Sequence, residues 1–381
     1  MLRFLSLFLL VLTVEAKAGG LCPLPQKDCE DTLSKTIRSH ADHFWCSVKK
    51  YKWPVVVKSL LQHEGVVVGD PHLGNFAVIP VETQAGQKRL QFVNVDFDDA
   101  GEGPFLLDFL RLYLATKAID KDLRNEDSHL EQILGFKEMW AAYLEGLKGG
   151  SVPVPDRIQK DLDIGLKGYE KELADLVEKK LKSKDKNRLS TKDDEFEELQ
   201  PNDIIQKEVA AKYLPGYEIL DVVRLRKKRG GSAKEDRFWV LVKDSQKQKR
   251  IFEFKGWSQT GLSSYQKQKK PLDWAQQLGP VMWPGLKIAN YDLHKIKGQY
   301  FWIREKRKVL TDVPYDLKKK KDVLYLQQSA EYFSYTLGQI HRRQNSAQKY
   351  LKALEKVSAS DELQEALKTF VKEYFKSLKS N

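Results

Sequence analysis

The chain has 381 residues, which at about 150 residues per domain is room for two domains. Hydrophobic residues make up 41% and exclude a disordered chain, because such chains lack the apolar surface that offsets chain entropy. The formal net charge is +12, yet residues 19–150 hold 15 Lys and Arg against 19 Asp and Glu, so the positive excess lies in residues 151–381. A basic surface can attract phosphates. Nucleic acid is not an expected partner, because no RNA-binding, helix-turn-helix or zinc-finger pattern is present.

The first eighteen residues predict a cleaved signal peptide. Arg3 is followed by an apolar run over residues 4–14 and by Ala16-Lys17-Ala18, which fits a small-residue cleavage site. The alternative is an uncleaved anchor. We therefore expect an exported protein, periplasmic or secreted, with no transmembrane segment after cleavage. In an oxidising compartment one disulfide can form among three cysteines, and the spacing does not select the pair. These cysteines are Cys22, Cys29 and Cys46.

Residues 19–182 are predicted to begin a helical lobe that also carries short strands. Apolar runs predict strands at 66–69 and 90–95, and helical spacing predicts helices at 105–118, 129–148 and 155–184. Pro104 stands where the first turn of a helix tolerates proline.

The rest of the chain separates into a linker, a sheet and terminal helices. Residues 183–200 are rich in charge without apolar rhythm and are predicted to be a flexible linker or exposed loop. A sheet lobe is expected over 201–310, and helices over 311–381 that pack on the helical lobe. The predicted strands are 217–225, 238–242, 250–254 and 300–304, and the predicted helices are 324–343, 347–357 and 361–378. Segregated strands and helices indicate an α+β fold.

Carboxylates at the ends of predicted strands are the strongest functional signal. Gly69-Asp70-Pro71-His72-Leu73-Gly74-Asn75-Phe76 follows one strand, and Asn94-Val95-Asp96-Phe97-Asp98-Asp99 follows the next. Loops at strand ends carry function on a rigid scaffold. The spacing from Asp70 to Asn75 is that of the phosphotransferase loop Asp-x-x-x-x-Asn, in which the Asp accepts the proton of the substrate hydroxyl.

This pattern assigns a role to each residue. Asp70 is the expected base, while Asn75 and Asp96 are expected to bind Mg²⁺ against nucleotide phosphates, with Asp98 as a further ligand. His72 either contacts phosphate or stabilises the loop. Asp108 is expected to pair with Arg111 and brace the loop. Taken one at a time, Asp70 can also be an ordinary turn residue, and the three later aspartates can form a solvated loop.

Residues 66–118 resemble the domain of unknown function 2252 family of bacterial proteins. The resemblance rests on Gly-Asp-x-His-x-x-Asn-Phe, on the Asp96-Phe97-Asp98-Asp99 stretch, and on Gly103-Pro104-Phe105 followed by Asp108 and Arg111. The same motifs are similar to the aminoglycoside-phosphotransferase branch of the protein-kinase-like fold. The resemblance implies a two-lobed kinase-like fold that uses ATP and Mg²⁺.

The second half of the chain resembles the sheet lobe of that family. Gly230, Gly231 and Ser232 resemble its glycine loop, and Ile251-Phe252-Glu253-Phe254-Lys255 resembles its strand that ends in Lys. The resemblance implies that these residues bind the nucleotide, with Lys255 on the phosphates. Two departures stand out. The catalytic loop precedes the sheet lobe, so the order is permuted, and Arg229 and Lys234 stand where the family has outer glycines.

The function implied is a Mg²⁺-dependent phosphotransferase that moves the γ-phosphate of ATP to an unknown hydroxyl acceptor, either a small molecule or a protein. One alternative is a non-catalytic kinase-like protein that binds a nucleotide or another ligand. The other is a metal-dependent phosphohydrolase, because Gly-Asp-x-His is similar to part of a metallophosphatase site. That class requires further Asp and Gly-Asn-His stretches that the sequence lacks.

Overall fold

A computed structural model describes residues 21–24, 30–126, 135–192, 196–226, 235–257, 259–269, 271–283, 286–287, 291–306, 320–357 and 361–378. The predicted signal peptide, Cys29 and the predicted glycine loop with Gly230, Gly231 and Ser232 lie outside the described residues. The chain mixes helices with antiparallel sheets, which confirms the α+β class. Among the described helices, none is both long and apolar enough to cross a membrane.

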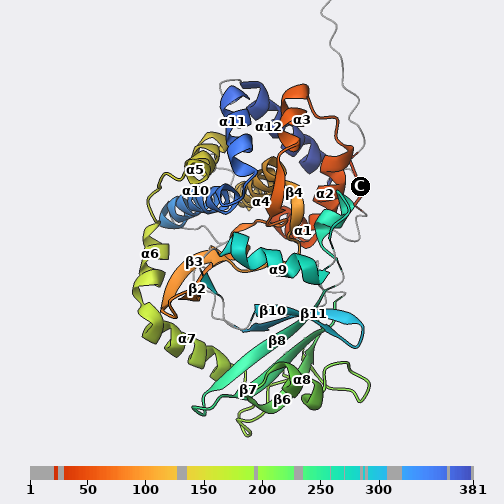
Figure 1. Cartoon of the computed structure of the whole chain (residues 1–381), viewed down its shortest axis with the longest axis vertical. Coiled ribbons are helices and arrows are strands. Elements are labelled where there is room, and N and C mark those ends of the chain that lie inside the picture. The colour runs from red at the N-terminus through yellow and green to blue at the C-terminus, as the bar shows by residue number, and fades with distance from the viewer. Residues whose placement is uncertain are drawn as a thin grey trace, which may run out of the picture.

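A helical part occupies one end of the molecule (Figure 1). The apolar residues of α4 from Phe105 to Leu123 are almost wholly buried, which places this helix at the centre of the helical part. Helices α5 and α10 cross closely, since a Cβ on Gly146 would lie 2.0 Å from the carbonyl oxygen of Tyr335. The helices are α1 (Leu33–Ser39), α2 (Ala41–Lys50), α3 (Val55–Leu61), α4 (Phe105–Glu126), α5 (Phe136–Lys148), α10 (Lys320–Arg342), α11 (Ala347–Val357) and α12 (Asp361–Ser377).

Two small sheets connect this part to the site. Strands β1 (Glu64–Val67) and β4 (Gly101–Pro104) pair antiparallel beside α4. Strands β2 (Phe76–Thr83) and β3 (Lys88–Asn94) form a hairpin, with β9 (Leu286–Lys287) on the other side of β2. The 3-10 turn η2 (Leu73–Asn75) leads into β2. The end of β1, the start of β2 and the end of β3 are therefore the places where the predicted catalytic motifs lie.

A six-stranded antiparallel sheet forms the other end of the molecule, in the order β10-β11-β8-β7-β6-β5. One face is apolar, with Phe238, Phe252 and Phe254 packed against the residues of α8 (Lys207–Tyr213). The opposite face carries charged side chains, because Glu253 and Lys255 alternate with those phenylalanines. The strands are β5 (Phe196–Glu198), β6 (Glu218–Leu225), β7 (Arg237–Lys243), β8 (Lys249–Trp257), β10 (Tyr291–Ile296) and β11 (Gln299–Glu305).

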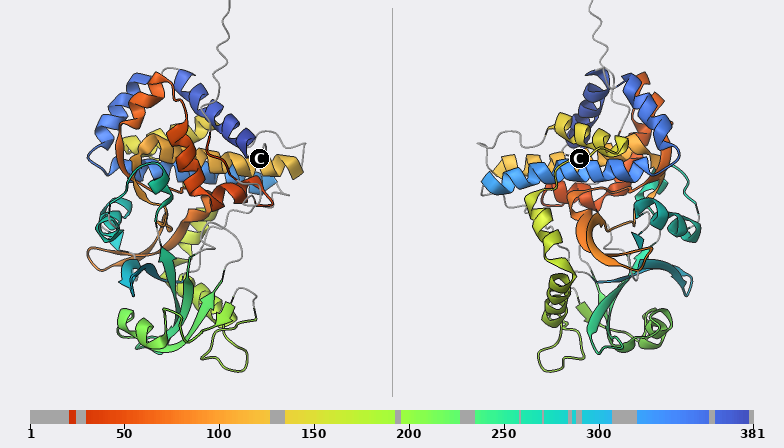
Figure 2. Two further views of the ribbon diagram at one scale, coloured as in Figure 1. Left: turned by 90° about the vertical axis from the view of Figure 1, so that its right-hand side faces the viewer. Right: turned by 60° about the vertical axis from the view of Figure 1, so that its left-hand side comes forward.

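Two helices run along one side from the helical part to the sheet, α6 (Asp156–Asp163) and α7 (Gly165–Lys179) (Figure 2). Val177 of α7 packs with Trp239 and Leu241 at one end of the sheet. Helix α9 (Pro271–Met282) lies between the helical part and the sheet (Figure 1), and the turn η3 (Gly261–Ser264) lies against α2 and β4.

The structure differs from the expected linker at 183–200. Leu189 is buried, and its bridge to Leu181 places it in the cluster with Trp239. Phe196–Glu198 then forms β5, the edge strand beside β6. The charge-rich sequence hides these contacts because only isolated apolar residues, Leu189 and Phe196, carry them.

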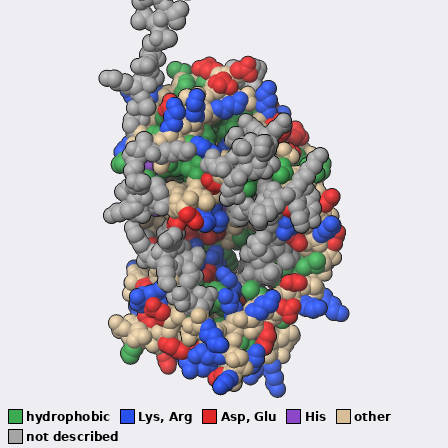
Figure 3. Space-filling model, turned by 180° about the vertical axis from the view of Figure 1, so that it is seen from behind, with side chains coloured by type: hydrophobic (Ala, Val, Ile, Leu, Met, Phe, Trp, Pro, Cys, Tyr) green, Lys and Arg blue, Asp and Glu red, His purple; other side chains and the backbone are tan. Residues whose placement is uncertain are grey.

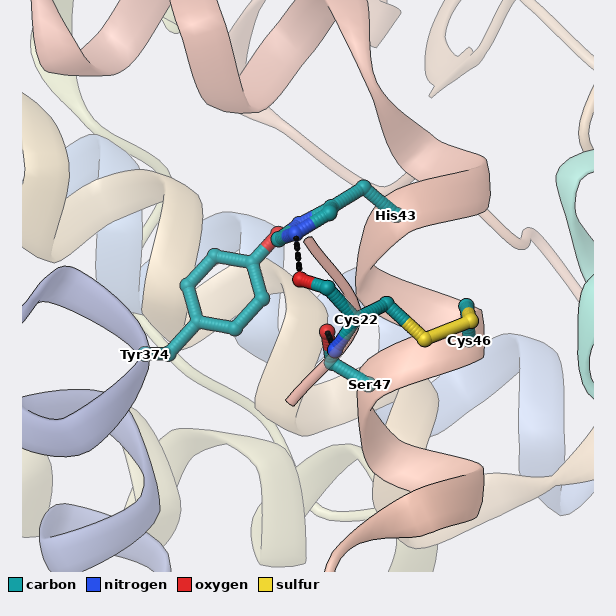
Figure 4. Close-up of a disulfide and its surroundings, with 5 residues drawn as sticks. All are labelled: Cys22, His43, Cys46, Ser47 and Tyr374. Carbon is teal, nitrogen blue, oxygen red and sulfur yellow. Dashed lines mark hydrogen bonds between the residues drawn. A yellow bond between two sulfur atoms is a disulfide. The ribbon is translucent and has the colours of Figure 1, made fainter. Parts of the chain in front are cut away.

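A disulfide joins Cys22 to Cys46 of α2 and settles the pairing that the sequence left open (Figure 4). The Nε2 atom of His43 donates to the carbonyl oxygen of Cys22 at 2.6 Å, since a carbonyl oxygen only accepts. Its Nδ1 atom lies 2.6 Å from the hydroxyl of Tyr374 in α12. Burial lowers the pKa of His43, which favours the neutral ring. The N-terminal segment is thus bound both covalently and through His43.

Replacing Cys22 by serine is expected to lower the free energy of unfolding by about 3 kcal/mol, because the disulfide spans 24 positions and restricts the unfolded chain. Denaturant unfolding under non-reducing conditions measures this loss. Reductant should cause the same loss in the wild type and none in Cys22→Ser. Equal denaturant midpoints for the wild type and Cys22→Ser under non-reducing conditions would contradict the Cys22–Cys46 disulfide.

Candidate functional site

The loop that carries Asp70 is positioned by hydrogen bonds to its backbone. The carboxylate of Asp108 in α4 accepts from the amides of Val68 and Gly69, at 2.9 Å each, and Trp45 Nε1 donates to the carbonyl oxygen of Gly69 at 2.7 Å. Gly69 has φ +81°, and a Cβ there would overlap the carbonyl oxygen of Asp99. The amide, the carbonyl oxygen and the Cα of Gly69, the residue before Asp70, are therefore all in contact with other parts of the chain.

Asp108 is itself part of a fully buried network. His341 Nε2 of α10 lies 3.0 Å from Asp108 Oδ2, and His341 Nδ1 lies 2.8 Å from the hydroxyl of Tyr143 in α5. The expected pair between Asp108 and Arg111 is wrong. The two residues are one turn apart on α4, but Asp108 faces the end of β1 and Arg111 pairs with Asp70 instead.

Asp70 is buried and bound by three side chains. Its Oδ1 accepts from Arg111, with Nη2 at 2.7 Å and Nε at 2.9 Å, and its backbone carbonyl accepts from Asn75 Nδ2 at 2.9 Å. His72 Nδ1 accepts from the amide of Gly74, so the proton of the neutral ring is on Nε2, which lies 3.6 Å from Asp70 Oδ2. Burial lowers the pKa of His72 to about 4. Of the two roles expected for His72, these contacts support the stabilisation of the loop.

The hairpin of β2 and β3 brings Asn75 beside Asp96. Phe76 pairs with Asn94, and the amide of Val95 donates to the carbonyl oxygen of Asn75 at 2.8 Å. Asn75 therefore precedes β2 at the same edge of the hairpin at which Asp96 follows β3. The antiparallel register explains why two residues that are 21 positions apart are neighbours.

Lys255 of β8 reaches the same place from the six-stranded sheet. Its Nζ lies 3.4 Å from Asp96 Oδ2 and also contacts Asp98 Oδ2, while Trp257 Nε1 donates to the carbonyl oxygen of Asp98 at 2.7 Å. Burial lowers the pKa of Lys255 to about 8, against the opposite effect of Asp96. Burial raises the pKa of Asp96, but the cations of Lys255, Arg304 and Arg237 outweigh it and hold this pKa well below its usual range.

Sequence reasoning missed a second ion cluster on the same face of the sheet. Glu253, which is 1% exposed, accepts from Arg304 at 2.8 Å and from Arg237 at 3.2 Å. Arg304 Nη1 also lies 3.6 Å from Asp96 Oδ1. Burial raises the pKa of Glu253, but Arg304, Lys306 and Arg237 hold it well below its usual range. The signal in the sequence was the charged residues that alternate with phenylalanine in β8, a pattern that is unusual for a buried strand.

Asp99 belongs to the predicted motif, but no role of its own was predicted for it. Its Oδ1 accepts from the amide of Gly261 at 2.7 Å, so the loop after β3 contacts the turn η3. Burial raises the pKa of Asp99 to about 7, with a further contribution from the carboxylate of Asp70. The space-filling view shows acidic and basic side chains close together at the level between the helical part and the sheet (Figure 3).

Asp96 and Asp98 offer carboxylate oxygens, which are the kind of ligand that Mg²⁺ prefers. Asp96 Oδ1 and Asp98 Oδ1 are buried, and none of the described residues donates a hydrogen bond to them. Mg²⁺ is usually bound by one or two carboxylates together with water and substrate phosphates, rather than by a complete protein cage. The described part of the chain contains no group of three or more His, Cys, Asp or Glu placed to hold a metal.

Comparisons of the chain with protein-family models, curated proteins and solved structures find no match. The resemblance to the domain of unknown function 2252 family and to the kinase-like fold therefore stays a prediction.

Replacing Asp108 by asparagine is expected to lower the free energy of unfolding by about 1–3 kcal/mol. The amide group of asparagine leaves at least one backbone or histidine donor of the buried network without an acceptor. Denaturant unfolding measures the loss, and Asp163→Asn on the exposed face of α6 should stay within about 0.5 kcal/mol of the wild type. An Asp108→Asn protein as stable as wild type would contradict the role given to this network.

Proposed function

We propose that the protein is a Mg²⁺-dependent phosphotransferase with a permuted kinase-like arrangement. The observation that carries the proposal is the meeting of Lys255 with Asp96, 159 positions away, where the sequence analysis assigned a phosphate-binding lysine and a metal-binding aspartate to one site. Phosphoryl transfer depends on such an arrangement, because positioning and charge stabilisation provide most of the catalysis.

The surrounding residues support distinct roles in this reaction. Asn75, Asp96 and Asp98 would hold Mg²⁺, which when bound neutralises charge on the phosphates. Lys255 and Arg304 would bind phosphate oxygens. Asp70 would orient the acceptor hydroxyl and accept its proton at Oδ2, the oxygen that Arg111 leaves open. The bond between the γ-phosphorus and the bridging oxygen breaks, a bond to the acceptor oxygen forms, and ADP leaves.

A second candidate is a protein that binds nucleotide without transfer. The specific observation in its favour is the contact of both Arg111 nitrogens with Asp70 Oδ1. These contacts give Asp70 a structural role, in which its pair with Arg111 of α4 positions the loop without any proton transfer. The two candidates share the nucleotide site and differ in whether Asp70 takes part in chemistry.

Asp96→Asn tests the shared site. Mg²⁺ and ATP at 100 times their dissociation constant should stabilise the wild type by about 2.7 kcal/mol, since the ligand binds only the folded protein. The variant should lose this stabilisation because it lacks one metal-binding carboxylate, whereas Asp163→Asn should keep it. Melting temperature with and without ligand is the measurement. A wild type that does not respond would refute the nucleotide site.

Asp70→Asn separates transfer from binding. Slow transfer of the γ-phosphate to water, followed with labelled ATP, should fall by about 10²–10⁴-fold when the base is removed. Stabilisation by Mg²⁺ and ATP should persist, because Asp70 is not among the residues assigned to the nucleotide. A wild type that binds ATP but transfers no phosphate to water or to any hydroxyl acceptor would favour the second candidate.

A further inference from the structure

Lys255 differs from Arg304 and Arg237, the other cations of the site, in the carboxylates with which it pairs. Glu253 binds Arg304 through two nitrogens and also binds Arg237, so Arg304 is fixed to the sheet whatever occupies the site. Within the described ranges, the carboxylate partners of Lys255 are Asp96 and Asp98 alone, the residues assigned to the metal. Its side chain is 6% exposed, so water does not replace those partners.

On this basis, and resting on the proposed function, we propose that Lys255 is an internal counter-cation of Asp96 and Asp98 that divalent metal displaces. Metal and polyphosphate would therefore bind cooperatively: the metal takes the carboxylates, and the phosphate takes the ammonium that they release. Lys255 would thus regulate the site as well as bind substrate.

The charges explain why the two occupants exclude each other. An ammonium and a divalent cation at the same pair of carboxylates repel, and the repulsion is strong where little water screens it. Lys255 is bound on the Oδ2 side of both aspartates. No described residue donates a hydrogen bond to either buried Oδ1 atom, and Arg304 Nη1 lies 3.6 Å from Asp96 Oδ1. The carboxylates thus have oxygens available for a metal, but the adjacent ammonium already neutralises part of their charge.

Bound phosphate would relieve the repulsion between the Lys255 ammonium and a metal ion at Asp96 and Asp98. When Lys255 leaves the carboxylates in the absence of phosphate, a buried ammonium has no counter-charge, which is unfavourable. A phosphate beside Arg304 gives the ammonium a new partner. Binding of the metal then favours binding of the phosphate, and by linkage the reverse holds to the same extent.

The test is the affinity for Mn²⁺ alone, measured by electron paramagnetic resonance of the free ion. Lys255→Met should bind Mn²⁺ about tenfold more tightly than the wild type, within the range that is typical of coupled sites. Lys243→Met is the control: it removes a lysine from the same sheet that pairs with Glu218, and its Mn²⁺ affinity should be unchanged. Since Lys255→Met removes the cation that Asp96 and Asp98 share and leaves Asp96 with Arg304, Mn²⁺ should also raise its melting temperature more than that of the wild type.

Inorganic triphosphate completes the test. It should raise Mn²⁺ affinity more in the wild type than in Lys255→Met. Triphosphate also chelates Mn²⁺ in solution, but this effect is the same for both proteins and cancels when they are compared. Equal Mn²⁺ affinity in wild type and Lys255→Met would overturn the inference even if ATP binds. Tighter Mn²⁺ binding by a folded Lys255→Met protein that does not respond to ATP would support the counter-cation role and refute the nucleotide site.

Discussion

Asp96 and Asp98 place two negative charges at the end of β3, where the protein shields them from much of the solvent. Such charges are stable only when cations and hydrogen bonds replace the lost water. The cations are Lys255 of β8 and Arg304 of β11, so this compensation also joins the six-stranded sheet to the hairpin of β2 and β3. The position of the sheet relative to Asp70 therefore depends on the same ion pairs that would bind a metal and phosphates.

The other half of the site belongs to the helical part. Asp108 and Trp45 bind the backbone at Gly69, and Arg111 binds the carboxylate of Asp70. Trp45 lies next to Cys46, so the disulfide stabilises the helix that contacts this loop. Asp70 is therefore held by the helical part, whereas the cations Lys255 and Arg304 belong to the six-stranded sheet. A reaction that needs a base on one side of a phosphate and cations on the other fits this division.

Motifs and strong periodicity were readable from the sequence, whereas long-range pairing was not. The helix at 347–357 and the strand cores in the sheet follow from spacing, and Asp70, Asn75 and Asp96 follow from a motif. Strand β2 was not predicted, since a proline within an apolar run, here Pro80, argues against a strand, yet β2 continues through it. The partner of Arg111 was missed because a carboxylate one turn away suggested a local pair. The cluster around Glu253 depends on the register of β8 with β7 and β11, which no local pattern reveals.

The decisive measurement is the position of Lys255 Nζ in a crystal structure with Mg²⁺ and a non-hydrolysable ATP analogue. We expect Nζ to leave both carboxylates and contact phosphate oxygens, Mg²⁺ to lie on Asp96 and Asp98, and Arg304 to stay on Glu253. Nucleotide bound elsewhere, or bound here while Lys255 remains on Asp96 and Asp98, would contradict this expectation.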